Sequence, residues 1–299
     1  MPDETGTRSL SGCPFPHDMN RILFEPGEIH DGRATFSDVR AEHVLNVLHG
    51  TEGQTLKTGI LDGPVGTSVI ERIEGNAVTV RCTHESPSLQ PWLDLILAPP
   101  RPRAMKRLLP QLASLGVRRI VLVGAEKVEK AFWGAQLLKE EIYRPLLVDG
   151  LQQAGTTAVP TIETFKSFRH FAERKLDAHF VDQPTRFVAH PEAIPLGEAT
   201  LLSLPAGTGH RQKRQECRFP EDAKRQECRF PEVPVLAVGP EGGWTDEEVG
   251  MLEEKGFARM SLGPRILRTD TALIALISRL MESFDMNAAK MAALPVNIA

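Results

Sequence analysis

The pattern of hydrophobic positions changes once along this chain. Between residues 20 and 86, short β-type runs alternate with turn signals, and from residue 91 onward apolar runs alternate with segments of helical periodicity. Short strands joined by hairpin turns are typical of a compact β-barrel, whereas alternating strands and helices indicate a largely parallel sheet. The pattern therefore predicts an α/β protein with a β-barrel domain at 20–86 and a second, α/β domain at 91–299.

Turn signals divide the first of these domains into strands. Asp62-Gly63 and Glu74-Gly75-Asn76 are typical of hairpin turns. Strands are predicted at 20–24, 54–61, 67–73 and 77–82, and a short amphipathic helix at 40–48. Residues 1–19 are interpreted as a disordered leader, and the serines and prolines of 86–91 as a linker.

In the second domain, apolar runs of strand length alternate with helical patterns. Strands are predicted at 93–97, 119–123, 185–189, 235–238 and 258–262, and helices at 106–115, 137–154, 165–174 and 271–286. A further helix is predicted between Thr245 and Gly256. It should begin with a capping box made by Thr245 and Glu248 and end at the glycine.

Two of the predicted strands end in glycine loops, Gly239-Pro240-Glu241-Gly242-Gly243 and Gly263-Pro264-Arg265. In open α/β sheets, ligands bind outside the carboxyl ends of strands, and glycine lets the main chain approach a ligand. The loops are therefore candidates for two walls of one pocket. The alternative is that the glycines only supply turn geometry. Neither loop contains a dinucleotide fingerprint or a P-loop.

Composition excludes several classes of protein. The chain is 41% hydrophobic and 25% charged, which suits a soluble globular protein. No apolar run reaches the roughly 20 residues that cross a bilayer, so no membrane partner is expected. The cysteines form no C-x-x-C pair and no metal-ligand spacing is visible, so neither a disulfide framework nor a metal is expected. A reducing cytoplasm is the expected location. The cysteines are Cys13, Cys82, Cys217 and Cys228.

The segment 99–144 is locally basic, although the whole chain carries a net charge of −4. It holds ten lysines and arginines against four glutamates. Arg101, Arg103, Lys106 and Arg107 are bunched directly after a predicted strand, where they could neutralise RNA phosphates. A solvated helix face is the alternative interpretation of the same charges.

A nine-residue stretch, KRQECRFPE, occurs twice, at Lys213–Glu221 and Lys224–Glu232. Two copies cannot stack into a solenoid core, so 213–232 is interpreted as a duplicated polar insertion that forms an exposed loop. Weak RNA binding and a neutral insertion are both open at this point.

The blocks VGPEGGWTDEEV and SLGPRILRTDTA closely resemble, in order and in spacing, the C-terminal signature of the RsmE-type 16S ribosomal RNA uracil-N3 methyltransferases of the SPOUT class. The blocks RAEHVLNVL, LAPPRPRAMKRLL, LGVRRIVLV, EKVEKAFW and LQQAGTTAVP are similar to the same family, so the resemblance extends from Asn20 to Leu280. It implies a SPOUT-type trefoil-knotted parallel sheet flanked by helices, with an N-terminal PUA-like β-barrel as RNA-docking domain. Knots are rare, so that expectation rests on the resemblance alone.

The resemblance also implies a cofactor, partners and site residues. The implied methyl donor is S-adenosylmethionine, the implied substrate is 16S rRNA or the small ribosomal subunit, and a homodimer is expected. The implied cofactor-binding residues are His190, Gly239, Glu241, Gly242, Leu262, Gly263, Ile266 and Leu267. The implied RNA-binding residues are Arg21, Arg101, Arg103, Lys106 and Arg107. A lone histidine beside proline, as at His190, is more often structural.

The implied chemistry is an in-line displacement in which uracil N3 attacks a sulfonium methyl group, so the first task is positioning. N3 carries a proton. A general base could remove it, or a cation could stabilise the developing uracil anion. Arg265 and Arg268 suit the second route and are the predicted catalytic residues, because arginine stays protonated. Glu241 or Asp270 would serve the first route, although acids are common near helix starts.

Two other functions compete with this hypothesis. One is a non-catalytic RNA-binding or ribosome-assembly factor on the same fold, and the other is a methyltransferase for another RNA site. The intact PEGG and RILRTDT loops favour an enzyme, and binding of S-adenosylmethionine would separate the first alternative from it.

Overall fold

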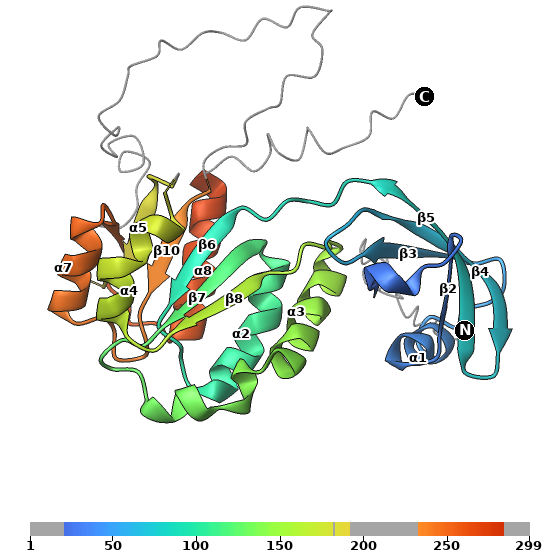
Figure 1. The fold of residues 1–299 in the computed structure, drawn as a ribbon, viewed down its shortest axis with the longest axis horizontal. Helices are drawn as coiled ribbons and strands as arrows, with labels where there is room; N and C mark the ends of the chain where they lie inside the picture. Colours follow the sequence, from blue (N-terminus) through green and yellow to red (C-terminus); the bar gives the residue numbers. More distant parts are fainter. Residues whose placement is uncertain (1–20, 182, 192–232, 284–299) are drawn as a thin grey trace, which may run out of the picture. The chain divides into compact units, whose positions relative to one another are not determined.

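The computed structural model describes residues 21–181, 183–191 and 233–283 (Figure 1). The expected leader, the duplicated segment at 213–232 and the end of the last predicted helix lie outside these residues. The described residues divide into two compact units. The β unit contains residues 21–88 together with Leu151–Thr157. The α/β unit contains Leu89–Gly150 and the described residues from Ala158 onward.

The described part of the β unit holds a five-stranded sheet in the order β1-β3-β4-β5-β2. Strand β1 pairs with β3 in parallel, and the other pairings are antiparallel. This sheet fits the barrel-like N-terminal domain expected from the sequence. Its elements are β1 (Ile22–Phe24), η1 (Pro26–Glu28), β2 (Arg33–Phe36), α1 (Val39–Asn46), β3 (Thr55–Ile60), β4 (Val65–Glu74) and β5 (Ala77–Ser86).

Alternation along the strands gives the β unit its core. Strand β2 alternates exposed and buried residues, and its Ala34 and Phe36 lie in the same cluster as Phe24, Val78 and Val80. The sequence pattern had not indicated β2. The strand is only four residues long and begins with an arginine, so its two apolar positions do not stand out from a loop.

A polar cluster joins β3, β4 and β5 of the same sheet. Thr58 and Ser68 are buried, and their hydroxyl oxygens are 2.7 Å apart. The Thr58 hydroxyl also contacts Nε2 of His84 at 2.7 Å. Arg21 donates from Nη1 to the carbonyl oxygens of Thr58 and Gly66, at 2.5 and 2.9 Å. The side chain of Arg21 is thus held by the β unit itself.

Acidification is expected to destabilise the β unit through His84. Burial lowers the pKa of the His84 imidazole below its ordinary value, and the charge of Arg21 lowers that pKa further. The unfolded chain therefore binds a proton that the folded imidazole resists. Stability is full above the ordinary pKa of about 6.5 and decreases as the pH falls toward the lowered folded value.

The free energy of unfolding, measured by urea denaturation at about pH 7.5 and about pH 5, tests this expectation. In His84→Gln, which keeps a polar group beside Thr58, the decrease should be smaller than in the wild type. Equal decreases in the two proteins would show that His84 does not cause the effect.

The described part of the α/β unit holds a six-stranded sheet in the order β11-β9-β10-β6-β7-β8, and every pairing in it is parallel. Its strands are β6 (Leu93–Leu97), β7 (Val117–Val123), β8 (Thr161–Phe165), β9 (Arg186–Ala189), β10 (Val235–Val238) and β11 (Ala258–Met260). Its helices are α2 (Pro102–Ser114), η2 (Lys130–Gly134), η3 (Gln136–Leu138), α3 (Glu140–Ala154), α4 (Phe168–Arg174), α5 (Leu176–His179), α7 (Asp246–Glu254) and α8 (Thr269–Ser283). The expected mixed α/β fold with a parallel sheet is confirmed.

Helices lie on both faces of this sheet (Figure 1). Helix α2 contacts α8, and α4 contacts α7. From β6 the chain continues to β7 and β8, toward one edge of the sheet. From β10 it continues to β11, which forms the opposite edge. Strands β6 and β10 are neighbours that lead in opposite directions, which makes their junction the topological switch point where α/β sheets bind ligands.

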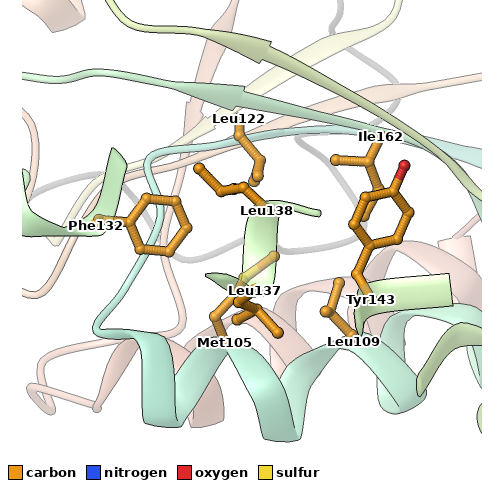
Figure 2. A pocket seen from close by; sticks show the side chains of 8 residues that line it. All are labelled: Met105, Leu109, Leu122, Phe132, Leu137, Leu138, Tyr143 and Ile162. Atoms are coloured by element: carbon orange, nitrogen blue, oxygen red, sulfur yellow. The ribbon is translucent and has the colours of Figure 1, made fainter. Parts of the chain in front are cut away.

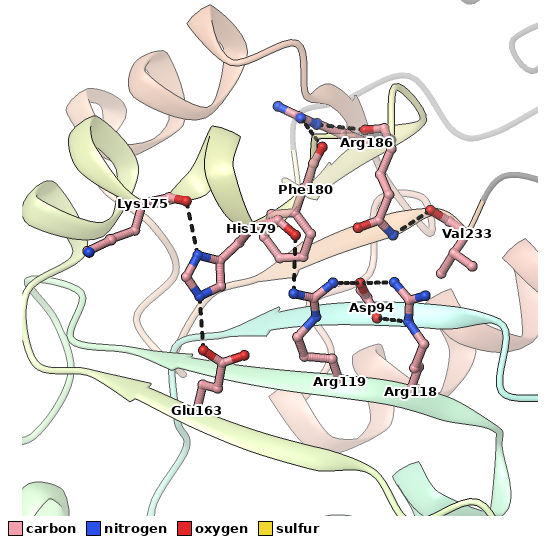
Figure 3. Close-up of polar contacts among 10 residues, drawn as sticks. Asp94, Arg118, Arg119, Glu163, Lys175, His179, Phe180, Arg186 and Val233 are labelled. Atoms are coloured by element: carbon pink, nitrogen blue, oxygen red, sulfur yellow. Dashed lines mark hydrogen bonds and ion pairs between the residues drawn. The ribbon is translucent and has the colours of Figure 1, made fainter.

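The central strands are buried along their whole length. All residues of β6 and β10 are buried, as expected for a parallel sheet covered on both faces. Burying one such Leu or Val side chain stabilises the fold by about 1.5–3 kcal/mol. Asp94 is the one charged residue in these two strands, and it is 0% exposed. Its carboxylate accepts hydrogen bonds from Arg118 and Arg119 of β7 (Figure 3).

Three expected helices differ from the structure. The helix expected at 106–115 begins four residues earlier, at Pro102. The helix expected at 137–154 is interrupted, because η3 ends at Leu138 and α3 begins at Glu140. The helix expected from Phe165 begins only at Phe168, because Ser167 caps it by accepting from the N–H of His170. Phe165 instead ends β8, a strand that the sequence pattern had not indicated.

Candidate functional site

The two glycine loops leave the same edge of the parallel sheet. The first follows β10 and the second follows β11, with β9 between these two strands. Neighbouring strands lie about 4.8 Å apart, so the ends of β10 and β11 are separated by about 10 Å. One nucleoside-sized ligand spans that distance. His190 follows β9 between the loops, and its main-chain N–H donates to the carbonyl of Met260 at 2.9 Å.

Close packing fixes the shape of the first loop. A Cβ atom on Gly239 would lie 3.0 Å from the main-chain nitrogen of Trp244, so a larger residue would push the two ends of the loop slightly apart. The Gly243 N–H donates to the carbonyl of Pro240 at 2.8 Å and closes a turn. The indole of Trp244 is buried against the ring of Phe168, with ring centres 5.2 Å apart.

The first loop also offers main-chain donors. Within the part of the chain that the structure describes, the N–H groups of Glu241 and Gly242 have no hydrogen-bond partner, and both residues are exposed. Glu241 points its carboxylate toward the loop after β6, where Oε1 accepts from the main-chain N–H of Arg101 at 3.1 Å. Two unused N–H groups suit a ligand that is held by main-chain atoms.

The second loop combines an unusual backbone conformation with exposed apolar side chains. Gly263 has φ +102°, which disfavours any side chain, and its N–H donates to the hydroxyl of Ser261 at 3.0 Å. Ile266 is 97% exposed, and Leu262 and Leu267 are exposed as well. Apolar side chains gathered on a surface loop favour a site that a ligand or a partner covers.

Arginines and one aspartate connect the second loop to α2. Arg268 and Arg107 both donate to Oδ2 of Asp270, at 3.3 and 3.2 Å. Partial burial would raise the pKa of Asp270. The N–H of Thr271 and the two arginines outweigh that effect and leave the pKa below its ordinary value. Asp270 is therefore ionised at neutral pH and a weak proton acceptor.

The basic residues expected to bind RNA belong to both units. Arg101, Arg103, Lys106 and Arg107 are exposed at the beginning of α2, which follows β6 at the same edge as the glycine loops. Arg101 also donates from Nε to Glu129 at 2.9 Å. Arg21 belongs instead to the β unit, where its guanidinium is bound to carbonyl oxygens. That geometry favours a structural role for Arg21.

The sequence did not indicate two residues of the site, nor a second contact made by a third residue, Glu248. Lys127 and Glu129, in the loop after β7, contact the first glycine loop and Arg101, respectively. Glu248 makes the predicted capping box with Thr245, and its Oε1 also accepts from the N–H of Glu126 at 2.8 Å. The box was readable as a local pattern, whereas contacts across more than 100 residues have no local signal.

An apolar hollow lies elsewhere in the α/β unit (Figure 2). It is lined by Met105, Leu109, Leu122, Phe132, Leu137, Leu138, Tyr143 and Ile162. The Tyr143 hydroxyl is the polar group of this lining, so the hollow resembles a packing gap in the core more than a reactive site.

Metal sites and membrane-spanning helices are both absent from the described residues. Among the described residues, no three His, Cys, Asp or Glu side chains are grouped so that they could hold a metal ion. Within those same ranges, no helix has both the length and the apolar character needed to cross a membrane.

Comparison with known proteins identifies the class. Residues 87–281 match the model of a family described as RNA methyltransferase domain. That match covers more than half of the chain, and the chain belongs to this family.

Two curated relatives narrow the family. The ribosomal RNA small subunit methyltransferase E of Treponema pallidum is 31% identical over 262 residues, which are 86% of this chain and 88% of that protein. The protein of the same name from Synechocystis is 25% identical over 88% of this chain and 78% of its own length. The chain is a member of the ribosomal RNA small subunit methyltransferase E family, as its two glycine-loop blocks had indicated.

Solved structures share the fold. Ribosomal RNA small subunit methyltransferase E of Neisseria gonorrhoeae, solved with S-adenosylmethionine, superposes with a TM-score of 0.61 at 22% identity, covering 88% of this chain and 97% of that one. A putative methyltransferase of Legionella pneumophila, also solved with this cofactor, superposes with a TM-score of 0.62 at 23% identity, covering 88% and 98%.

Proposed function

We propose that this protein is an S-adenosylmethionine-dependent methyltransferase that methylates N3 of a specific uridine in 16S ribosomal RNA. The observation that carries the proposal is the strand order β11-β9-β10, in which the two glycine loops follow strands that are separated by β9 alone. Family membership supports methyl transfer to ribosomal RNA, because the curated relatives are named for that activity. The solved relatives with bound S-adenosylmethionine support the choice of methyl donor.

The residues of the two loops fit this donor. The free N–H groups of Glu241 and Gly242 would hold its polar atoms, and the exposed side chains of Leu262, Ile266 and Leu267 would pack against its adenine ring. Gly239 and Gly263 keep the main chain close to it, and His190 forms the third wall from the end of β9. When bound, the donor supplies an electrophilic sulfonium methyl group.

The charged residues act on the uracil. Arg265 and Arg268 stabilise the negative charge that develops on the base as N3 releases its proton to solvent. Asp270 is ionised and already paired with arginines, and Glu241 accepts a main-chain hydrogen bond, so neither is favoured as a general base. Electrostatic stabilisation by arginine is therefore the proposed mechanism.

RNA contacts are proposed at the exposed beginning of α2, through Arg101, Arg103, Lys106 and Arg107. These cations lie at the sheet edge that carries the glycine loops, where phosphates flanking the target base would pass. The family resemblance further supports a trefoil knot in a SPOUT domain at 91–299, a PUA-like RNA-docking domain at 20–86, a cytoplasmic location and a homodimer.

Two measurements test the proposal. Calorimetry should give binding of S-adenosylmethionine to the purified protein, and its absence would favour a non-catalytic assembly factor. Mass spectrometry of ribosomal RNA from cells with and without the gene should give one methyl group lost from uracil N3 in the deletion strain. Loss of a methyl group from any other position would refute the proposed specificity.

A further inference from the structure

Lys127 connects the loop after β7 to the first glycine loop. Its Nζ donates to the carbonyl of Gly242 at 2.9 Å and to the carbonyl of Trp244 at 3.3 Å. Its aliphatic stem lies against Gly242, because a Cβ atom placed there would be 3.0 Å from Cδ of Lys127. An exposed lysine thus uses both its charge and its stem on one short stretch of main chain.

These contacts fix two peptide planes. A trans peptide points its C=O and N–H in opposite directions, so a hydrogen bond at each end defines its orientation. The carbonyl of Gly242 is held by Lys127, and the N–H of the same peptide, from Gly243, donates to Pro240 at 2.8 Å. The carbonyl of Trp244 is held by Lys127, and the N–H of that peptide, from Thr245, donates to Glu248 at 2.9 Å.

The loop after β7, which contains Lys127, makes a second contact with this region through Glu126. Glu248 accepts from the N–H of Glu126 at 2.8 Å, so residues 126 and 127 brace both the turn and the helix start that follows it. The N–H groups of Glu241 and Gly242, in the same turn, have no partner among the described residues.

We propose that Lys127 is a positioning residue for the methyl donor. It does not touch the donor but holds the Gly242 and Trp244 peptides so that the free N–H groups of the loop are preset for binding. This inference rests on the proposed function, because it assigns the loop to S-adenosylmethionine. Without the ammonium group, the loop must be ordered at each binding event, which weakens donor affinity but leaves the reacting groups unchanged.

The test compares Lys127→Met, which keeps the stem and removes the donor, with Lys127→Arg, which keeps a charged donor. For Lys127→Met the dissociation constant and KM for S-adenosylmethionine should rise about tenfold, the effect of losing one charge-assisted hydrogen bond. The kcat and the melting temperature should stay close to wild type, and Lys127→Arg should recover most of the affinity. Lys139→Met is the matched control, since Lys139 is an exposed lysine that pairs with Glu141.

Each outcome has one meaning. If wild type binds no S-adenosylmethionine, the proposed function fails, whatever the variants do. If wild type binds but Lys127→Met has unchanged affinity, the positioning role of Lys127 is wrong. A loss of kcat and melting temperature that Lys127→Arg does not rescue would likewise overturn it, because Lys127 would then only support the fold.

Discussion

Arg268→Ala is expected to reduce turnover by about 100- to 1,000-fold, the usual cost of removing one group that stabilises charge in a transition state. The affinity for S-adenosylmethionine should change little, because the role proposed for Arg268 is on the uracil and not on the methyl donor. Its side chain is 74% exposed and tethered to Asp270 at 3.3 Å, so its removal leaves no cavity and no buried charge. Single-turnover methylation of 16S rRNA and calorimetry with the methyl donor would measure the two effects separately.

Arg72→Ala provides the matched control for this experiment. Arg72 is 62% exposed and pairs with one acid, Glu74, but it lies in the β unit. Its removal should leave turnover close to wild type. If Arg268→Ala and Arg72→Ala behave alike, the charge role of Arg268 is wrong. If Arg268→Ala weakens donor binding as much as it slows turnover, Arg268 binds the donor rather than stabilising the uracil.

Much of the α/β unit could be predicted because its strands are buried on both faces. β10 is a continuous apolar run and β6 is apolar except for Asp94, and the predicted bounds of both strands agree with the structure. The capping box of Thr245 and Glu248 was also readable, since all its atoms come from four consecutive residues. Buried runs and local caps are patterns that need no partner to be recognised.

Strands with mixed composition were not predictable in this way. β8 contains Thr161, Glu163 and Thr164 beside two apolar residues, and it lies at the edge of the sheet. It is therefore a strand because it pairs with β7, and not because it is hydrophobic. Such pairing is a long-range property. A sequence pattern contains the residues but not the neighbour.

The same distinction applies to the candidate site. The two glycine loops could be recognised from their residues, but that β9 lies between β10 and β11 is a property of the sheet alone. The contacts of Lys127 with Gly242 and of Arg107 with Asp270 join residues 115 and 163 positions apart. The sequence therefore predicts which loops are candidates for the site, and the structure adds which side chains hold them.

The Asp94 carboxylate is the centre of a buried charge cluster whose loss should destabilise the α/β unit. Arg118 donates to both carboxylate oxygens, at 2.9 and 2.7 Å, and Arg119 donates to Oδ2 at 2.7 Å (Figure 3). Arg119 also donates to the carbonyl of His179, and its guanidinium lies 4.9 Å from the ring centre of Phe180. One carboxylate thus connects β6 to β7 and, through Arg119, to the end of α5.

Asp94→Asn is expected to lower the free energy of unfolding by about 3 kcal/mol, because removing one partner of a buried ion pair leaves the other charges uncompensated. Removing one partner of a buried ion pair usually costs about 3–5 kcal/mol. We expect the lower end of that range, because Arg118 is 41% exposed and can turn to water. Arg119 is only 20% exposed and keeps part of the cost. Urea denaturation monitored by circular dichroism would measure the change.

Asp177→Asn is the matched control. Asp177 also pairs with two cations, Lys255 and Arg186, but is 59% exposed, so its loss should cost at most about 1 kcal/mol. Asp94 and Asp177 differ in burial. Equal losses of unfolding free energy in the two variants would therefore mean that burial does not determine how much the cluster contributes.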